Sequence, residues 1–232
     1  MTFGLARGKT LEIKGYGLTT ADLSPFERGR IDPRNWFDAP ANRFEIEIGS
    51  GKGTFLLQHA RAAPEVNLLG IESAGEFFRY AADRLRRHQI ANARILFGDA
   101  IEFMRFWCAN EVAAVIHLYF SDPWPKSRHH KRRVVQDASM IEFARVLQPG
   151  AELRLVTDHD ELWAWYENHA ARHDGLFERR PFESSASAGE NEIVGTNYER
   201  KFARQGRPFH AMTLVKKAHV KAQNGLIDAA PN

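Results

Sequence analysis

Four carboxylate residues, Glu47, Glu72, Asp99 and Asp122, stand at or just after the ends of short apolar segments. A carboxylate at the end of a strand accepts hydrogen bonds from both hydroxyls of a ribose, and it attracts a cationic group while repelling a diphosphate. The set therefore indicates a nucleoside cofactor that carries positive charge and no phosphate. S-adenosylmethionine, with an amino-acid group and a sulfonium, has both properties.

A glycine-rich loop, Glu47-Ile-Gly49-Ser-Gly51-Lys-Gly53, follows the first of these segments. Glycines let the backbone turn sharply and let a ligand approach closely. Glycine at every second position differs from the G-x-G-x-x-G fingerprint of dinucleotide-binding proteins. An NAD-dependent oxidoreductase is therefore the less favoured alternative.

A second loop, Ser121-Asp122-Pro123-Trp124-Pro125-Lys126, follows the longest apolar run and leads into Ser-Arg-His-His-Lys-Arg-Arg. Two prolines around a tryptophan make a rigid loop, which would hold Asp122 beside the reactive end of the cofactor. The cations that follow suit phosphate groups, and a helix beginning there would favour them further. The combination favours an active site over a solvated basic turn, although Trp124 is equally compatible with packing.

These residues need a scaffold that brings several strand ends to one edge. The sequence predicts strands at 43–48, 66–72, 94–97, 112–120, 151–157, 177–182 and 210–217, and helices at 52–63, 75–88, 99–108, 128–147 and 160–173. Repeated βα units predict an α/β fold of the Rossmann-like type, with a mostly parallel seven-stranded sheet and helices on both faces. Ligands bind such sheets at the carboxyl ends of the strands.

The ends of the chain differ from this repeating pattern. Residues 1–42 are rich in glycine and proline and predict an irregular N-terminal arm. We expect the main domain at residues 43–220 and a flexible tail at 221–232.

The charges are unevenly distributed. Lys and Arg number 32 against 29 Asp and Glu, but residues 123–133 hold five basic residues and residues 200–221 hold seven, with no acid in either stretch. Such segments indicate an anionic partner, with nucleic acid the leading candidate over a merely solvated face.

Other classes of protein fit the composition poorly. The single cysteine, Cys108, excludes an intramolecular disulfide framework and a cysteine-built zinc site. The ten histidines show no metal-ligand spacing, so no metal is expected. The apolar runs are too short to span a bilayer, so a cytoplasmic protein with no membrane partner is expected.

The segment Phe120-Ser-Asp-Pro-Trp-Pro-Lys-Ser-Arg-His-His-Lys-Arg-Arg133 resembles the signature of the bacterial tRNA (guanine-N7)-methyltransferase family, which modifies a guanosine in the tRNA variable loop. Further segments fit the same family: Glu47–Gly53, Gly70-Ile-Glu72, Gly98-Asp99-Ala100, Val156-Thr157-Asp158 and Gly195-Thr196-Asn197-Tyr198-Glu199. Ser121 and His159 depart from the family pattern. The resemblance covers about residues 43 to 217, and the Asp-Pro-Trp-Pro-Lys and Thr-Asn-Tyr-Glu segments are its specific parts.

The resemblance implies a methyltransferase domain at 43–220 and a role for each matched residue. Contacts to S-adenosylmethionine are implied for Glu47, Gly49, Gly51, Glu72, Asp99, Ala100 and Asp122, with Asp122 also the active-site residue. Contacts to the substrate guanosine are implied for Lys126, Asp158, Thr196, Asn197, Tyr198 and Glu199. Contacts to RNA are implied for Arg128, His129, His130, Lys131, Arg132 and Arg133.

The chemistry of such a reaction needs orientation more than proton transfer. Guanine N7 has a free lone pair, so alignment with the methyl group in a dry pocket suffices without a general base. Asp122, Asp158 and Glu199 are the candidates to select guanine through its N1 and N2 hydrogens.

A non-enzymatic RNA-binding relative is the alternative, and the sequence leaves open whether the protein is a monomer or a homodimer. We expect tRNA, not DNA, as the partner.

Overall fold

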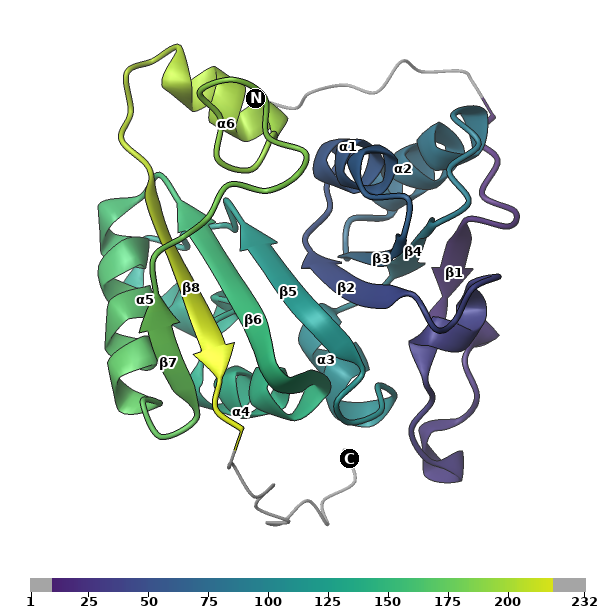
Figure 1. Ribbon diagram of the computed structural model, residues 1–232, viewed down its shortest axis with the longest axis horizontal. Helices are drawn as coiled ribbons and strands as arrows, with labels where there is room; N and C mark the ends of the chain where they lie inside the picture. Colours follow the sequence, from purple (N-terminus) through teal and green to yellow (C-terminus); the bar gives the residue numbers. More distant parts are fainter. Residues whose placement is uncertain (1–9, 219–232) are drawn as a thin grey trace.

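The computed structural model describes residues 10–218 and contains one sheet with helices on both faces (Figure 1). The strands are β1 (Gly17–Thr19), β2 (Arg43–Ile48), β3 (Val66–Glu72), β4 (Ala93–Phe97), β5 (Ala113–Tyr119), β6 (Leu147–Thr157), β7 (Phe177–Arg180) and β8 (His210–Lys216). The helices are α1 (Thr54–Ala62), α2 (Gly75–Arg87), α3 (Ala100–Phe106), α4 (Asp137–Val146), α5 (Asp160–Arg172) and α6 (Asn197–Ala203). Short 3-10 helices lie at Thr20–Asp22, Phe26–Arg28, Pro33–Trp36 and Ser127–Arg132.

The strand order, β1-β4-β3-β2-β5-β6-β8-β7, places β2 and β5 side by side at the centre. The chain moves outward from β2 through β3 and β4, and then outward in the other direction from β5 through β6. The junction of β2 and β5 is therefore the topological switch point, where a ligand site is expected. Among the described strands, β8 alone points in the direction opposite to all the others, so its pairings with β6 and β7 are antiparallel.

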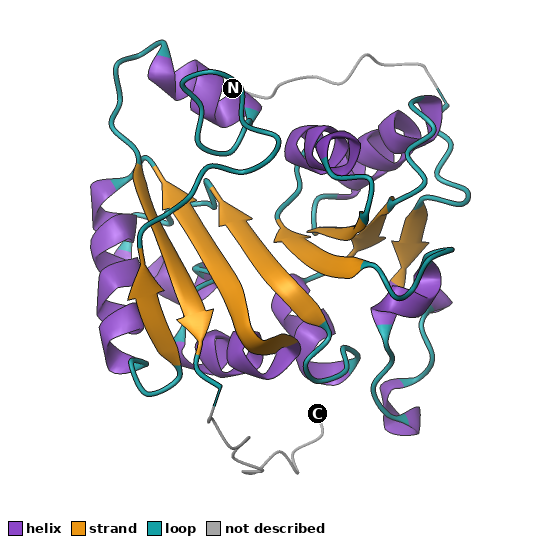
Figure 2. Ribbon diagram, viewed as in Figure 1, coloured by secondary structure: helices purple, strands orange, loops and turns teal. Residues whose placement is uncertain are grey.

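Two apolar cores lie between the sheet and the helices, one on each face of the sheet. The helices α3, α4 and α5 pack on one face, where Phe44, Ile46 and Ile48 of β2 point. The helices α1 and α2 pack on the other face with Phe55 and Phe78. The segment 182–194 joins that second core, and it covers the part of the face that α1 and α2 leave open. Figure 2 shows this long loop crossing the sheet toward α6.

The predicted mostly parallel α/β fold is confirmed, with two corrections. The sheet has eight strands, not seven, because residues 17–19 of the expected irregular arm pair in parallel with β4. The helix expected over 128–147 is wrong in its first half. There, Ser127–Arg132 forms a 3-10 helix and α4 begins only at Asp137. The basic run therefore does not sit on the N-terminus of a long helix. The predicted tail, 221–232, lies outside the described residues.

Two other expectations concern the core and the membrane. Cys108 is fully buried, and burial raises the pKa of its thiol to about 12, so it behaves as a core residue. Within residues 10–218, no helix combines the length and the hydropathy needed to cross a bilayer.

Gly70 in β3 lies where the glycine loop and α1 approach the sheet closely. A Cβ atom at this position would overlap the Ser50 hydroxyl and lie 2.9 Å from Leu56 Cδ2. Ser50 belongs to the loop after β2, and Leu56 to α1. Glycine at position 70 therefore lets the loop and the helix settle onto β3.

We predict that Gly70→Ala lowers the free energy of unfolding by about 1 to 3 kcal/mol, because overpacking forces the loop or α1 outward. Chemical denaturation measures the change. Gly175→Ala is the matched control, because a Cβ there meets nothing within 4 Å and its backbone φ is not in the left-handed region. Equal stability of the two variants would contradict the close approach.

Candidate active site

The glycine loop is held in place by Glu72 at the end of β3. Glu72 Oε2 accepts from the backbone N–H of Gly51 at 2.7 Å, and Oε1 accepts from that of Ala74 at 2.7 Å. Gly49, Gly51 and Gly53 all have left-handed backbone, with φ of 75°, 53° and 66°. The loop therefore needs these glycines, and the buried carboxylate of Glu72 fixes its shape while remaining able to accept further bonds.

Glu47 lies at the mouth of this loop and is 5 % exposed. Its Oε2 is buried and accepts no hydrogen bond from any residue between 10 and 218. Burial, together with the nearby charge of Glu72, raises the pKa of this carboxyl to about 8, although the Ser50 hydroxyl acts in the opposite direction. A buried acceptor without a donor is costly, so this position is suited to a ligand that brings one.

Asp99 and Ala100 stand at the start of α3, beside the end of β4. Asp99 is exposed, and its Oδ1 caps the helix by accepting from Ile101 N at 2.8 Å and Glu102 N at 3.0 Å. The residue therefore has a structural role as a cap in addition to the cofactor contact that the sequence predicts.

The loop that carries Asp122 has strained backbone on both sides of Asp122, and the side chain of Arg133 holds it in place. Phe120 and Trp124 have left-handed backbone, with φ of 53° and 42°, which is unusual for aromatic residues. Arg133 donates from Nε to Pro123 O at 2.8 Å and from Nη2 to Glu161 Oε1 at 2.5 Å. The exposed Asp122 is thus presented on a braced turn, as strained functional loops commonly are.

The two departures from the family pattern are accommodated locally. The Ser121 hydroxyl lies 2.8 Å from the Tyr166 hydroxyl of α5, so a polar residue at this position has a partner. His159 begins α5 by accepting from Leu162 N through Nδ1 at 3.3 Å.

The basic run divides into exposed and buried members. Lys126, Arg128, Lys131 and Arg132 are exposed, and the Arg132 guanidinium stacks over Trp124 at 4.9 Å. His129 and His130 are half-buried. Arg133 is 3 % exposed and also stacks on Trp165. The Arg133 guanidinium is committed to the loop above it, which does not favour the RNA contact expected for this residue.

A third segment reaches the same edge from the C-terminal part of the chain. Thr196 caps α6 by accepting from Glu199 N at 3.0 Å. The Glu199 carboxylate, 1 % exposed, accepts from the backbone N–H groups of Ile193, Val194 and Gly195. Glu199 therefore builds the loop before α6. A bond to guanine would compete with three backbone bonds, so a guanine-selecting role for it is not supported by this geometry.

Tyr198 differs from its neighbours because it is 51 % exposed. Its ring lies 6.5 Å from Phe120 and 6.1 Å from Phe202, both at shallow interplanar angles. Phe209 packs edge-on against Phe120 at 5.6 Å. This aromatic cluster (Phe120, Tyr198, Phe202 and Phe209) joins α6 to the residue two positions before Asp122.

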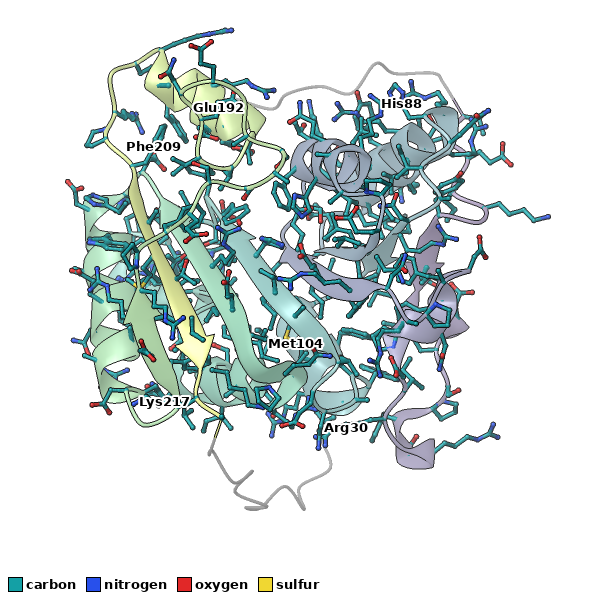
Figure 3. All side chains as sticks on the ribbon, in the orientation of Figure 1. Arg30, His88, Met104, Glu192, Phe209 and Lys217 are labelled. Atoms are coloured by element: carbon teal, nitrogen blue, oxygen red, sulfur yellow. The ribbon has the colours of Figure 1, made fainter. Side chains whose placement is uncertain are left out.

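Contacts between elements place α6 over the carboxyl edge of the sheet. Arg207 Nη1 donates to Asp158 Oδ2 at 2.9 Å, which ties the segment after α6 to the end of β6. Arg200 of α6 donates to Glu192 at 2.5 Å and to Gln58 of α1 at 3.4 Å. In Figure 3, Phe209 and Glu192 lie beside α6, at the opposite end of the molecule from Lys217.

The residue positions therefore converge. Aligned register pairs, Ile48 with Ile71, Glu72 with Phe97, and Tyr119 with Val156, bring the ends of five parallel strands to one edge. The predicted site residues follow those ends or lie on the segment above them. A loop for a nucleoside, a buried carboxyl that needs a cationic donor, and a rim of exposed cations together resemble a nucleic-acid-modifying site.

Comparison with known proteins agrees with this arrangement. A family model described as "Putative methyltransferase" matches residues 41–212. The tRNA (guanine-N(7)-)-methyltransferase of Nitrobacter hamburgensis is 36 % identical over 210 residues, covering 88 % of this chain and 82 % of that protein. The enzyme of the same name from Agrobacterium fabrum is 30 % identical over 227 residues, covering 93 % and 94 %.

The chain belongs to the tRNA (guanine-N7)-methyltransferase family.

Solved structures show the same fold at greater distance. The 16S rRNA methyltransferase KamB has a TM-score of 0.55 at 15 % identity, covering 86 % of this chain and 93 % of that chain. A 30S ribosomal A1408 methyltransferase from an uncultured bacterium has a TM-score of 0.54 at 13 % identity, covering 79 % and 90 %. These likenesses concern the fold alone.

The site of this methyltransferase fits S-adenosylmethionine on the strength of its own donors and acceptors. The acceptor oxygen of Glu47 lacks a donor, and the ammonium group of the cofactor would supply one. Glu72 is fixed where a ribose would be expected, and the glycine backbone leaves space above the loop. No Cβ placed at Gly49 or Gly51 would meet an atom within 4 Å, which agrees with an open approach.

A buried polar network that the sequence pattern does not reveal lies beside this site. Glu45 Oε2 accepts from His59 Nε2 at 2.9 Å and from His117 Nε2 at 2.8 Å, and His117 Nδ1 lies 2.7 Å from the Tyr119 hydroxyl. Arg43 Nε donates to the other oxygen of Glu45 at 2.8 Å. The signals were a glutamate and a histidine inside buried strands, which periodicity treats only as breaks in an apolar pattern.

Glu45, His59 and His117 lie close enough together to hold a metal ion, because one donor atom of each lies within 4.8 Å of the others. The sequence spacing gave no indication of this cluster, because its members come from β2, α1 and β5. The Glu45 carboxylate is engaged at hydrogen-bond distances by the two imidazoles and by Arg43, whereas His59 Nδ1 has no partner among the described residues. Burial lowers the pKa of His117 to about 4, and the two histidines lower that of Glu45.

We predict that Glu47→Gln stabilises the unliganded protein increasingly as pH rises. A carboxyl with a folded pKa of about 8, against an ordinary value of 4.5, contributes full stability below pH 4.5 and loses it as pH rises toward 8. Glutamine does not titrate, so the difference in unfolding free energy should grow by about 1.4 kcal/mol per pH unit in this window. Urea unfolding of both proteins at pH 5, 6.5 and 8 measures it. A difference independent of pH would contradict the raised pKa.

Proposed function

We propose that this protein methylates N7 of a guanosine in the variable loop of tRNA, at the carboxyl edge of β2, β5 and β6. As a member of its family it is an enzyme, and S-adenosylmethionine is its methyl donor. The observation that carries the proposal is the convergence of Glu47, Glu72 and the Asp122 loop at one edge, beneath α6. Exposed cations border the same edge.

The bound cofactor supplies a methyl group that its positive sulfur already activates. The residues of the chain therefore need only to bind, align and exclude water, because guanine N7 carries no proton. Glu47, Glu72 and Asp99, with the backbone of Gly49, Gly51 and Ala100, hold the donor in this scheme. Asp122 is the catalytic residue, which orients the base and offsets the positive charge that develops on it.

The substrate side of the proposal rests on the segment above the sheet. Tyr198 offers an exposed ring on an aromatic cluster beside the Asp122 loop, suited to stacking on a purine. We also assign contact with the guanosine to Lys126, which follows the Asp122 loop, and to Asp158, which follows β6. Thr196 and Glu199 act by shaping the loop that presents Tyr198, and Asn197 belongs to the same motif.

We assign RNA contact to Arg128, His129, His130, Lys131 and Arg132, with Arg133 as their internal brace. We also propose residues 43–220 as the methyltransferase domain, preceded by an arm of which β1 joins the sheet. We also propose a cytoplasmic location, because that is where a tRNA substrate would be met.

We predict that Asp122→Asn lowers kcat for methyl transfer to unmodified tRNA by about a hundredfold, because a misaligned base rarely reaches the methyl group. The assay follows transfer of a labelled methyl group and maps the product nucleoside. Asp174→Asn, which changes an exposed aspartate on the turn after α5, should leave kcat unchanged. Absence of 7-methylguanosine with the unaltered protein would refute the proposed function, and its appearance outside the variable loop would refute the assigned position.

We predict that Lys131→Ala with Arg132→Ala weakens tRNA binding and flattens its salt dependence. Loss of two phosphate contacts should reduce the slope of log K against log salt by about 1.5 to 2. The matched control is Arg179→Ala with Arg180→Ala, which removes the same charge from the edge strand β7. Filter binding at several salt concentrations measures both. A slope that falls equally in the two pairs would indicate a general charge effect rather than a local RNA surface.

A further inference from the structure

Two buried carboxyl groups lie two residues apart on one face of β2, and they differ in their hydrogen-bond partners. Glu45 is 4 % exposed and receives hydrogen bonds from His59, His117 and Arg43. Glu47 is 5 % exposed and has an oxygen without a donor among residues 10–218. The first carboxylate is complete within the protein, whereas the second is not.

The surroundings of Glu47 favour its neutral form when no ligand is present. Glu72 across the β2–β3 pair is acidic, and its oxygens are bonded to backbone N–H groups. On the other side, β5 presents His117, whose Nε2 donates to Glu45, and the buried Tyr119 hydroxyl. From α1, His59 also donates to Glu45. The Ser50 hydroxyl alone acts to lower the pKa of Glu47, which burial holds at about 8.

We propose that Glu47 is protonated in the unliganded enzyme and releases that proton to solvent when the ammonium group of the methyl donor enters. This rests on the proposed function, because it takes the glycine loop as the cofactor site. The ammonium group keeps its own protons, and Glu47 changes from a neutral acid to a carboxylate that accepts from it. Ion pairing in a buried site favours the charged form of both partners.

Two consequences distinguish this exchange from ordinary ion pairing. At pH 7, a group with a pKa of about 8 is protonated in about nine molecules of ten, so ligand binding should release about 0.9 proton. Below pH 7 the affinity should fall about tenfold per pH unit, because each binding event must remove a proton from Glu47. An α-amino group stays protonated in this range, so the ligand itself does not cause the change.

Titration calorimetry of S-adenosylhomocysteine at pH 6.5, in three buffers of different ionisation enthalpy, measures the released proton directly. This ligand carries the same amino-acid group as the methyl donor but no transferable methyl. We expect a slope near one proton per site with the unaltered protein. With 5′-methylthioadenosine, which lacks the amino-acid group, we expect a slope near zero in the same protein.

The Glu47→Gln variant should bind S-adenosylhomocysteine more weakly, release no proton and lose the pH dependence of affinity between pH 6 and 7. Glu76→Gln, which alters an exposed glutamate at the start of α2, should retain a full proton release. Release that persists in Glu47→Gln would overturn the proposal by placing the proton elsewhere.

The outcomes separate this inference from the function beneath it. Tight binding of S-adenosylhomocysteine with a slope near zero overturns the proton exchange and leaves the methyltransferase assignment intact. Failure of both S-adenosylmethionine and S-adenosylhomocysteine to bind overturns the cofactor site and the exchange together. Because the comparison of two ligands uses the unaltered protein, the result does not depend on the folding of any variant.

Discussion

Carboxylates buried beside the central junction of β2 and β5 impose the main constraint on this structure. An ionised carboxylate without partners is expensive to bury, since its hydration is lost. Glu45 meets that constraint by drawing an imidazole from α1 and another from β5, so the network fixes the helix that begins at the glycine loop relative to the strand that ends at the Asp122 loop. The geometry of the two loops is thereby coupled through one oxygen atom.

The loop after β5 uses a buried cation in the same way. Arg133 has a side chain 1 % exposed, and it bonds to the backbone of the Asp-Pro-Trp-Pro segment and to Glu161 of α5. A guanidinium suits this task because its planar set of donors reaches several acceptors while its face stacks on an aromatic ring. The left-handed backbone at Phe120 and Trp124 persists because the surroundings hold the turn between them.

Much of this arrangement could be predicted from the sequence. Alternation and apolar runs located the strands from 43 onward, and residues after strand ends marked the site, because both depend on local pattern and on the parallel topology. The predictions that failed concern structure that depends on contacts between residues far apart in the sequence. β1 is three residues long and gains its stability from pairing with β4, which no local pattern encodes. The helix expected from residue 128 was interrupted because Ser127–Arg132 follows the braced loop, and Arg133 turns inward to hold it.

Side-chain roles within the recognised motifs were the least predictable part, because a residue type does not reveal whether it faces a ligand or its own backbone. Glu199 bonds to three backbone N–H groups and Thr196 caps α6, whereas Tyr198 between them is exposed. The motif therefore contains residues that build the loop and a residue that the loop presents.

The distinction between residues that build the protein and residues that face a ligand also applies to the basic side chains. Arg133, Arg200, Arg207 and Lys216 all bond to acidic side chains, namely Glu161, Glu192, Asp158 and Glu111. An ion pair between two residues of the same chain contributes little electrostatic field outside the protein, since the two charges largely cancel at a distance. The second acid-free stretch, 200–221, is thus neutralised in part by acids elsewhere in the chain, whereas Lys126, Arg128, Lys131 and Arg132 remain exposed beside Asp122. The exposed cations of the first stretch thus adjoin the loop where the chemistry is proposed, which favours an approach of the RNA backbone from that side.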